Sequence, residues 1–160
     1  MPEGPLAYVG LGANLGDAAA TLRQALRDLA VQPGVQLLRA SSFYRSAPVD
    51  AGGPDFVNSV AELRVALSPQ ALLTALQAIE QQHGRQRPYR NAPRTLDLDL
   101  LLVGDVQLDT PDLLLPHPRL HERAFVLRPL SELSPDLLIP GRGPLGPWLA
   151  ATASQVIERL

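Results

Sequence analysis

The sequence of 160 residues has no cysteine, which excludes a disulfide framework, a thiolate zinc site and a thiol nucleophile. It also has no lysine, since all 14 basic residues are arginines. A phosphate-binding loop that depends on a lysine is therefore excluded. Any phosphate would have to be bound by planar, bidentate guanidinium groups.

Long apolar runs are missing as well. No stretch approaches the roughly 18 to 20 residues that cross a bilayer, and the first residues lack the basic region of a signal peptide, so we expect a cytoplasmic protein that does not bind membranes. The net charge of −2 and the pI of about 5.9 argue against a nucleic-acid-binding protein. With 46% hydrophobic and 19% charged residues, the length predicts one folded domain over residues 1–160.

The hydrophobic pattern predicts an α+β fold. Strands are expected at 6–11, 35–45, 56–67 and 95–103, and amphipathic helices at 18–31 and 69–84, the second with Ser68 as N-cap. This β-α-β-β-α-β order is that of a ferredoxin-like core, an antiparallel sheet with both helices on one face. After Gly104 the chain becomes rich in proline, which predicts a C-terminal elaboration of short strands and helices that wraps the core.

Two carboxylates provide the first candidate site. Asp97 and Asp99 are two residues apart on a predicted strand, so both side chains leave the same face. Such a pair suits an Mg²⁺ ion whose coordination is completed by water and phosphate oxygens, although a pair of solvated charges on the strand is the simpler interpretation. Four arginines and no acidic residue precede the pair between residues 81 and 96, and this favours polyphosphate chemistry over a merely solvated loop.

Aromatic residues provide a weaker signal. Phe56 and Asn58 would share one strand face and could stack on and hydrogen-bond a flat heterocycle, although a strand phenylalanine is more often part of the core. His117 and His121 have helical i, i+4 spacing, but Pro118 between them argues against a zinc pair. The early glycines are one residue too widely spaced for a dinucleotide fingerprint, which we reject.

These motifs together resemble the 6-hydroxymethyl-7,8-dihydropterin pyrophosphokinase family over roughly residues 6–140. The segments that carry the resemblance are Ala7–Gly16, Ser42–Pro48, Asp55–Asn58, Gly84–Arg85, Pro93–Asp99, Pro116–His117 and Arg123–Leu130. The resemblance implies a ferredoxin-like enzyme of folate biosynthesis that transfers pyrophosphate from ATP to the pterin and releases AMP. It also implies small-molecule substrates, two Mg²⁺ ions and no obligate protein partner.

Site residues follow from the resemblance, motif by motif. Asp97 and Asp99 would hold the two Mg²⁺ ions and act in catalysis with Arg85 and Arg94. Residues implied in pterin binding are Ser46, Val49, Phe56, Asn58 and Phe125. Residues implied in ATP binding are Gln77, Glu80, Arg85, Arg87, Arg90, Arg94, Leu100, His117 and Arg123.

Two departures from the familiar bacterial pattern concern how the arginine segment closes over the substrates. Asn91 stands where that form has a tryptophan, and Pro118 stands where it has a tyrosine. We expect residues 84–93 to form a lid that ATP and pterin order together. Two other functions stay open from the residues alone: a ferredoxin-like module that binds an anion without catalysis, and a kinase that transfers a single phosphoryl group.

Overall fold

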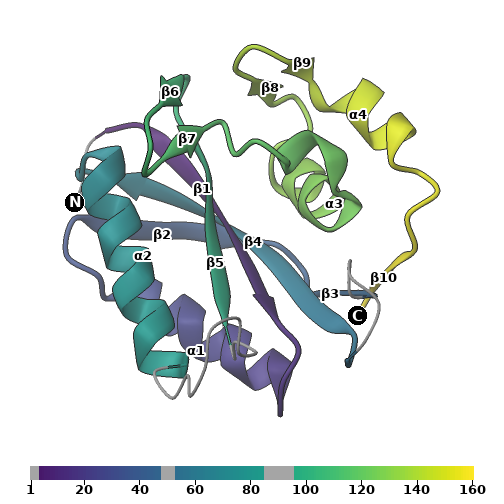
Figure 1. Cartoon of the computed structure of the whole chain (residues 1–160), viewed down its shortest axis with the longest axis horizontal. Helices are drawn as coiled ribbons and strands as arrows, with labels where there is room; N and C mark the ends of the chain where they lie inside the picture. Colours follow the sequence, from purple (N-terminus) through teal and green to yellow (C-terminus); the bar gives the residue numbers. More distant parts are fainter. Residues whose placement is uncertain (1–3, 48–52, 85–95) are drawn as a thin grey trace.

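The computed structural model describes residues 4–47, 53–84 and 96–160, and a six-stranded antiparallel sheet is at its centre (Figure 1). Its strands are β1 (Leu6–Ala13), β2 (Val35–Ala40), β3 (Tyr44–Ser46), β4 (Phe56–Val65), β5 (Asp97–Val103) and β10 (Ile157–Arg159). β1 pairs with β4 on one side and with β5 on the other, and β2 and β3 pair in succession with the far edge of β4. This is the strand order of a ferredoxin-like fold, so that prediction is confirmed.

Two helices cover one face of this sheet, as predicted: α1 (Ala18–Ala30) and α2 (Pro69–Gly84). Each begins at a side-chain cap. Asp17 accepts from the backbone N–H of Ala20 at 3.1 Å, and Ser68 accepts from that of Ala71 at 3.1 Å. The apolar faces of both helices meet inward-pointing strand residues in one hydrophobic core.

The C-terminal part covers a portion of the opposite face. It contains two short hairpins, β6 (Leu108–Asp109) with β7 (Leu114–Leu115) and β8 (Leu138–Ile139) with β9 (Gly143–Pro144). It also contains the 3-10 helix η1 (Leu120–Glu122), α3 (Ala124–Leu133) and α4 (Leu145–Ala151). The elaboration is therefore present as expected, and α3 and α4 form a second core there. None of the described helices is long and apolar enough to cross a membrane.

An ion pair between the buried Glu62 and the exposed Arg39 joins the C-terminal end of α3 to the sheet. Glu62 accepts from the Tyr8 hydroxyl at 2.6 Å and from two N–H groups of Arg39 at 3.1 Å each, and Arg39 also donates to the Leu133 carbonyl at 2.6 Å. Burial raises the pKa of Glu62, but the hydrogen bonds from Arg39 and Tyr8 outweigh it and leave that pKa lowered. Burial and the bond to Glu62 raise the pKa of Tyr8 to about 12.

The strand boundaries differ in part from the sequence prediction: β4 ends two residues earlier and β5 begins two residues later than expected, and two further differences affect the site. The strand expected at 35–45 is divided into β2 and β3, because the Ser41 hydroxyl accepts the Val60 N–H at 2.9 Å and interrupts the regular pairing. The first strand extends two residues further than predicted, to Ala13, so Gly12 lies inside β1 and pairs with residues on both neighbouring strands.

Candidate active site

Small residues on β1 leave room for a cavity on the α3 side of the sheet. Gly10 pairs with Asp99, and Gly12 pairs with Asp97 on one side and with Asn58 on the other. The cavity measures about 450 Å³, within the range of small-molecule sites. We call it the main cavity, and its lining residues are Gly10, Leu11, Gly12, Asn14, Ser46, Ala47, Phe56, Asn58, Ser59, Asp97, Asp99, Arg123, Phe125 and Val126.

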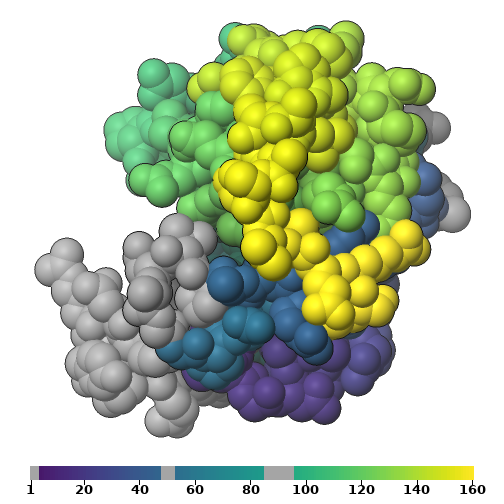
Figure 2. Space-filling model, turned by 90° about the vertical axis from the view of Figure 1, so that its right-hand side faces the viewer, coloured from purple at the N-terminus to yellow at the C-terminus, as the bar shows by residue number. Residues whose placement is uncertain are grey.

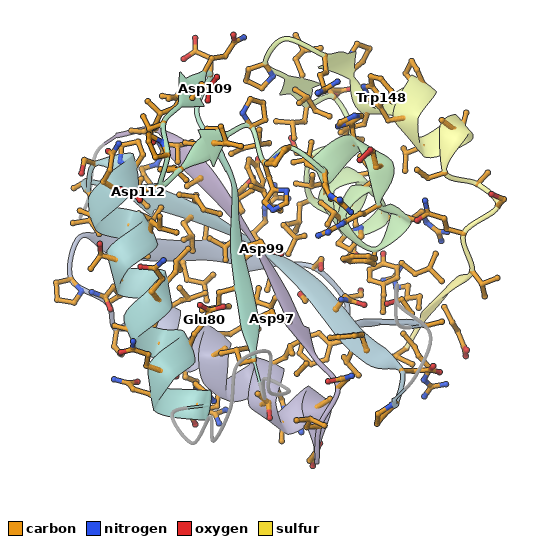
Figure 3. The ribbon with its side chains drawn as sticks, in the orientation of Figure 1. Glu80, Asp97, Asp99, Asp109, Asp112 and Trp148 are labelled. Atoms are coloured by element: carbon orange, nitrogen blue, oxygen red, sulfur yellow. The ribbon has the colours of Figure 1, made fainter. Side chains whose placement is uncertain are left out.

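Asp97 and Asp99, the acidic pair, both face the main cavity from β5 (Figure 3). The leucines on either side of Asp99 point to the opposite face and are buried in the helix-side core. The prediction that both carboxylates share one face is therefore confirmed, and its cause is the two-residue period of a strand. Across the described residues no group of three or more acidic or histidine side chains could hold a metal by itself.

The predicted aromatic and amide residues meet at the same cavity. Phe56 and Phe125, the ring pair, are both half-buried and line it from β4 and from the first turn of α3. Asn58 is buried on β4, between β1 and β3. Its Oδ1 accepts from the Ser46 hydroxyl at 2.6 Å, so its NH₂ group points toward Gly12 on the cavity floor. The Arg123 guanidinium lies 5.5 Å from the centre of the Phe125 ring.

A smaller cavity of about 250 Å³ opens at the free edge of β5, between α2 and the β6–β7 hairpin. Its lining includes Leu100 and His117, two of the predicted ATP-binding residues, and Asp99, which lines the main cavity as well. Asp99 is therefore the residue that the two cavities share. We call the smaller one the side cavity.

His117 is half-buried near Asp99. Burial lowers the pKa of His117, and the guanidinium groups of Arg123 and Arg119 lower it further against the opposing charge of Asp99. Its Nδ1 accepts from the backbone N–H of Arg119 at 3.1 Å, which leaves the proton of the neutral ring on Nε2. His121 instead packs edge-on against Trp148, with ring centres 4.8 Å apart.

The two predicted residues on α2 lie apart from these cavities. Gln77 is exposed, and Glu80 accepts from the backbone N–H of Leu98 at 2.8 Å, a group on the free edge of β5 (Figure 3). In the part of the chain that the structure describes, neither residue lines the main or the side cavity. Val49, Arg85, Arg87, Arg90 and Arg94 lie outside the described residues, as does most of the expected lid.

Sequence reasoning assigned no site role to the two glycines of the cavity floor: it rejected them as a dinucleotide loop and otherwise used them only within the segment Ala7–Gly16 that carries the family resemblance. A Cβ atom at Gly12 would lie 3.2 Å from Asn58 Nδ2 and 3.8 Å from the Phe56 ring, in the space that the cavity occupies. The signal was present: Gly10 and Gly12 have the same two-residue spacing as the acidic pair, and that spacing places them on one face of β1.

The fold and the main cavity define a ferredoxin-like protein with carboxylates, an arginine and aromatic rings around one cavity. A family model described as 7,8-dihydro-6-hydroxymethylpterin-pyrophosphokinase (HPPK) matches residues 8–135, and the chain belongs to this family. The family resemblance read from the motifs is therefore confirmed.

Relatives in two bacteria carry the name 2-amino-4-hydroxy-6-hydroxymethyldihydropteridine pyrophosphokinase. The one from Pseudomonas aeruginosa is 47% identical over 154 residues, which cover 96% of this chain and 95% of that protein. The one from Synechocystis is 47% identical over the same length and share of this chain, and the match covers 75% of that protein.

Among solved structures, a Plasmodium falciparum HPPK-DHPS triple mutant superposes with a TM-score of 0.74 at 14% identity, and the match covers 96% of this chain and 45% of that one. The chain thus spans less than half the length of that structure, whose likeness concerns the fold.

Family membership confirms the predicted activity. The chain is a pyrophosphokinase that transfers pyrophosphate from ATP to 6-hydroxymethyl-7,8-dihydropterin in folate biosynthesis. An anion-binding module without catalysis is not favoured.

Proposed function

We propose that the main cavity binds the dihydropterin beside the acidic pair, and that the acidic pair holds two Mg²⁺ ions together with the phosphates of ATP. One observation carries the proposal: β4, β5 and the start of α3, which are far apart in the sequence, contribute an aromatic ring or a carboxylate to the same cavity. We further propose that the chain acts as one domain on these small molecules without an obligate protein partner.

The ring pair and Asn58 suit a pterin. A pterin is flat and carries hydrogen-bonding groups along its edge, so it needs aromatic faces above and below and a fixed polar partner at the side. Phe56 and Phe125 supply the faces. Asn58 supplies the edge contact, and the short hydrogen bond from Ser46 fixes the orientation of its amide before any ligand binds.

The acidic pair fits Mg²⁺ by its chemistry. Mg²⁺ prefers oxygen ligands and is commonly held by one or two carboxylates, while water and substrate phosphates complete its coordination. Asp97 and Asp99 are two such ligands on a rigid strand, next to an open cavity where phosphates can approach. When bound, Mg²⁺ would neutralise charge on the triphosphate and orient its oxygens.

ATP would extend from the side cavity toward the main cavity. Apolar walls that include Leu73 and Leu100 suit a nucleoside, and the shared position of Asp99 is where a phosphate chain would pass from one cavity to the other. His117 would donate from Nε2 to a phosphate oxygen, and Arg123 would bind phosphate from the α3 side. Arg85, Arg87, Arg90 and Arg94 would complete the phosphate contacts, and Gln77 and Glu80 would support the nucleotide.

The reaction then needs positioning and charge stabilisation more than covalent chemistry. The ring pair holds the pterin so that its hydroxymethyl oxygen faces the β-phosphorus in line with the leaving group. A bond forms between this oxygen and the β-phosphorus, the hydroxyl proton is released to solvent, and the bond from the β-phosphorus to the oxygen that bridges to the α-phosphate breaks. AMP leaves with that oxygen, and Arg123 with the predicted arginines stabilises its charge.

Nucleotide analysis of one reaction mixture tests the proposal. With ATP, the dihydropterin and Mg²⁺, we expect AMP in equal amount to the pterin diphosphate, no product after chelation of the metal, and recovery when Mg²⁺ is restored. ADP in place of AMP would indicate transfer of a single phosphoryl group. Full activity in the presence of chelator would contradict the assignment of Mg²⁺ to the acidic pair.

A further inference from the structure

We infer that Gln155 is a positioning residue for substrate binding, because its side-chain amide fixes the backbone that presents Arg123 and Phe125 to the main cavity. Gln155 Oε1 accepts from the backbone N–H of Ala124 at 2.9 Å, and Nε2 donates to the carbonyl of Glu122 at 2.8 Å. The two bonds hold the peptide groups on either side of Arg123. The inference rests on the proposed pterin site.

The start of α3 needs such an external partner. The N-cap residue is Arg123, whose side chain has only donors and makes no capping hydrogen bond. The first N–H groups of a helix lack acceptors within the helix, so a partner from elsewhere must satisfy them. Gln155 supplies this acceptor from a position 31 residues further along the chain.

Side-chain packing covers Phe125 only in part: it packs against the second core but is half-buried. The ring borders the main cavity and also a rear cavity of about 420 Å³, which lies between η1, the first turn of α3 and the C-terminal segment. Arg123 and Ser46 line both cavities as well, and Gln155 lines the rear one. Because part of Phe125 borders these cavities and only part of it packs against the second core, its position also depends on the backbone that Gln155 holds.

The same segment also fixes the opposite wall of the main cavity. β10 pairs with β3, with Ile157 opposite Ser46, and the Leu160 N–H donates to the Phe43 carbonyl at 2.9 Å. Figure 2 shows this C-terminal segment, in yellow, running from the helices of the second core down to the edge of the sheet. Residues 155–159 therefore join the wall that carries Phe125 to the wall that carries Ser46, whose hydroxyl orients Asn58. They lie beyond residue 135, where the family match ends.

Gln155→Ala tests the inference without disturbing a core, because this residue is exposed. The measurement is the Kd of the dihydropterin with a non-hydrolysable ATP analogue at saturation, together with the thermal unfolding midpoint. The loss of two hydrogen bonds predicts roughly five- to tenfold weaker pterin binding and a thermal midpoint lowered by only a few degrees, so the protein stays folded in the assay. Gln155→Glu keeps an acceptor for Ala124 but loses the donor, so its Kd should be intermediate. Gln70→Ala removes the same exposed side chain from the start of α2 and should leave the Kd unchanged.

A double-mutant cycle separates a positioning role from a general structural one. If Gln155 acts through the ring, Gln155→Ala should weaken pterin binding in the wild type and have little further effect in Phe125→Ala. An unchanged Kd in Gln155→Ala, or the same fold loss in both backgrounds, would overturn the inference. If Phe125→Ala itself leaves the Kd unchanged, the proposed pterin site fails instead, so the two failures are distinguishable.

Discussion

Gly12→Ala is the most direct test of the cavity floor. Gly12 lies in extended backbone within β1, so alanine is compatible with its conformation, and the only new feature is one methyl group that points into the main cavity. That methyl carbon would lie 3.2 Å from Asn58 Nδ2, closer than an ordinary van der Waals contact. Asn58 has little freedom to move away, because the Ser46 hydroxyl holds its other amide atom at 2.6 Å.

The expected cost falls on pterin binding. Either the contact between Asn58 and the pterin edge or the hydrogen bond from Ser46 must lengthen, and the methyl group also displaces the pterin. We therefore expect the free energy of pterin binding to weaken by about 1 to 2 kcal/mol, or roughly 5- to 30-fold in Kd. Folding stability should change little, because the lower conformational freedom of alanine in the unfolded chain offsets the close contact.

The assay is AMP formation at saturating ATP with varied dihydropterin, accompanied by the Kd of each substrate. Gly146→Ala is the matched control: it adds the same methyl group within α4, where no heavy atom lies within 4 Å. It should leave the Kd of both substrates unaffected, because Gly146 lines neither the main nor the side cavity. A pterin Kd within twofold of wild type for a folded Gly12→Ala protein would refute the reasoning, as would an equal loss for ATP.

The remaining predictions concern the acidic pair, the ring pair and the Arg39–Glu62 ion pair. Asp97→Asn or Asp99→Asn should lower turnover by roughly 100-fold or more without lowering the thermal midpoint, because the charge is lost and a close repulsion is relieved; near-normal turnover at ordinary Mg²⁺ would contradict this. Alanine at either member of the ring pair should weaken pterin binding by roughly 1 to 3 kcal/mol and spare ATP, whereas equal losses would indicate a core role. Glu62→Gln should lower the free energy of unfolding at pH 7 by about 2 kcal/mol. Because the folded-state pKa of Glu62 is lowered, its carboxylate stabilises the fold above the ordinary value of 4.5 and this contribution is lost as the pH falls through the folded pKa. Urea unfolding of the wild type and of Glu62→Gln from pH 7 to pH 3 should therefore show that the difference in their free energies of unfolding shrinks. A constant difference would contradict the stabilising role of the ion pair.

The helices and strands that local signals determine were predictable. α2 begins at Pro69 after its Ser68 cap because both signals act within one turn, and β5 alternates because successive side chains point to opposite faces. The division between β2 and β3 was not predictable, since it depends on a hydrogen bond between Ser41 and Val60, which the chain brings together only after β4 has paired.

The same distinction holds for the site. The two-residue period of a strand was enough to predict that the acidic pair shares one face of β5, and that Phe56 and Asn58 share one face of β4. Nothing local indicated that Phe125 joins them, because its place depends on how α3 packs on the sheet; only the family resemblance supplied it. The proline-rich pattern also hid α3 itself, which accommodates the buried Pro129 within the helix.

The placement of the site follows from how the two faces of the sheet are used. On the helix-covered face, the strands contribute large apolar residues to one core, which is why the opposite face of β1 and β5 can carry glycines and carboxylates without loss of that core. On this opposite face, apolar residues return further along the same strands, where α3 covers them. The main cavity therefore lies where the second core ends, and its far wall is the first turn of α3.

The position of that wall depends on both ends of α3: the hydrogen bond from Arg39 to the Leu133 carbonyl at one end and the amide of Gln155 at the other. Substitutions at either contact should consequently alter pterin binding although neither side chain lines the main cavity.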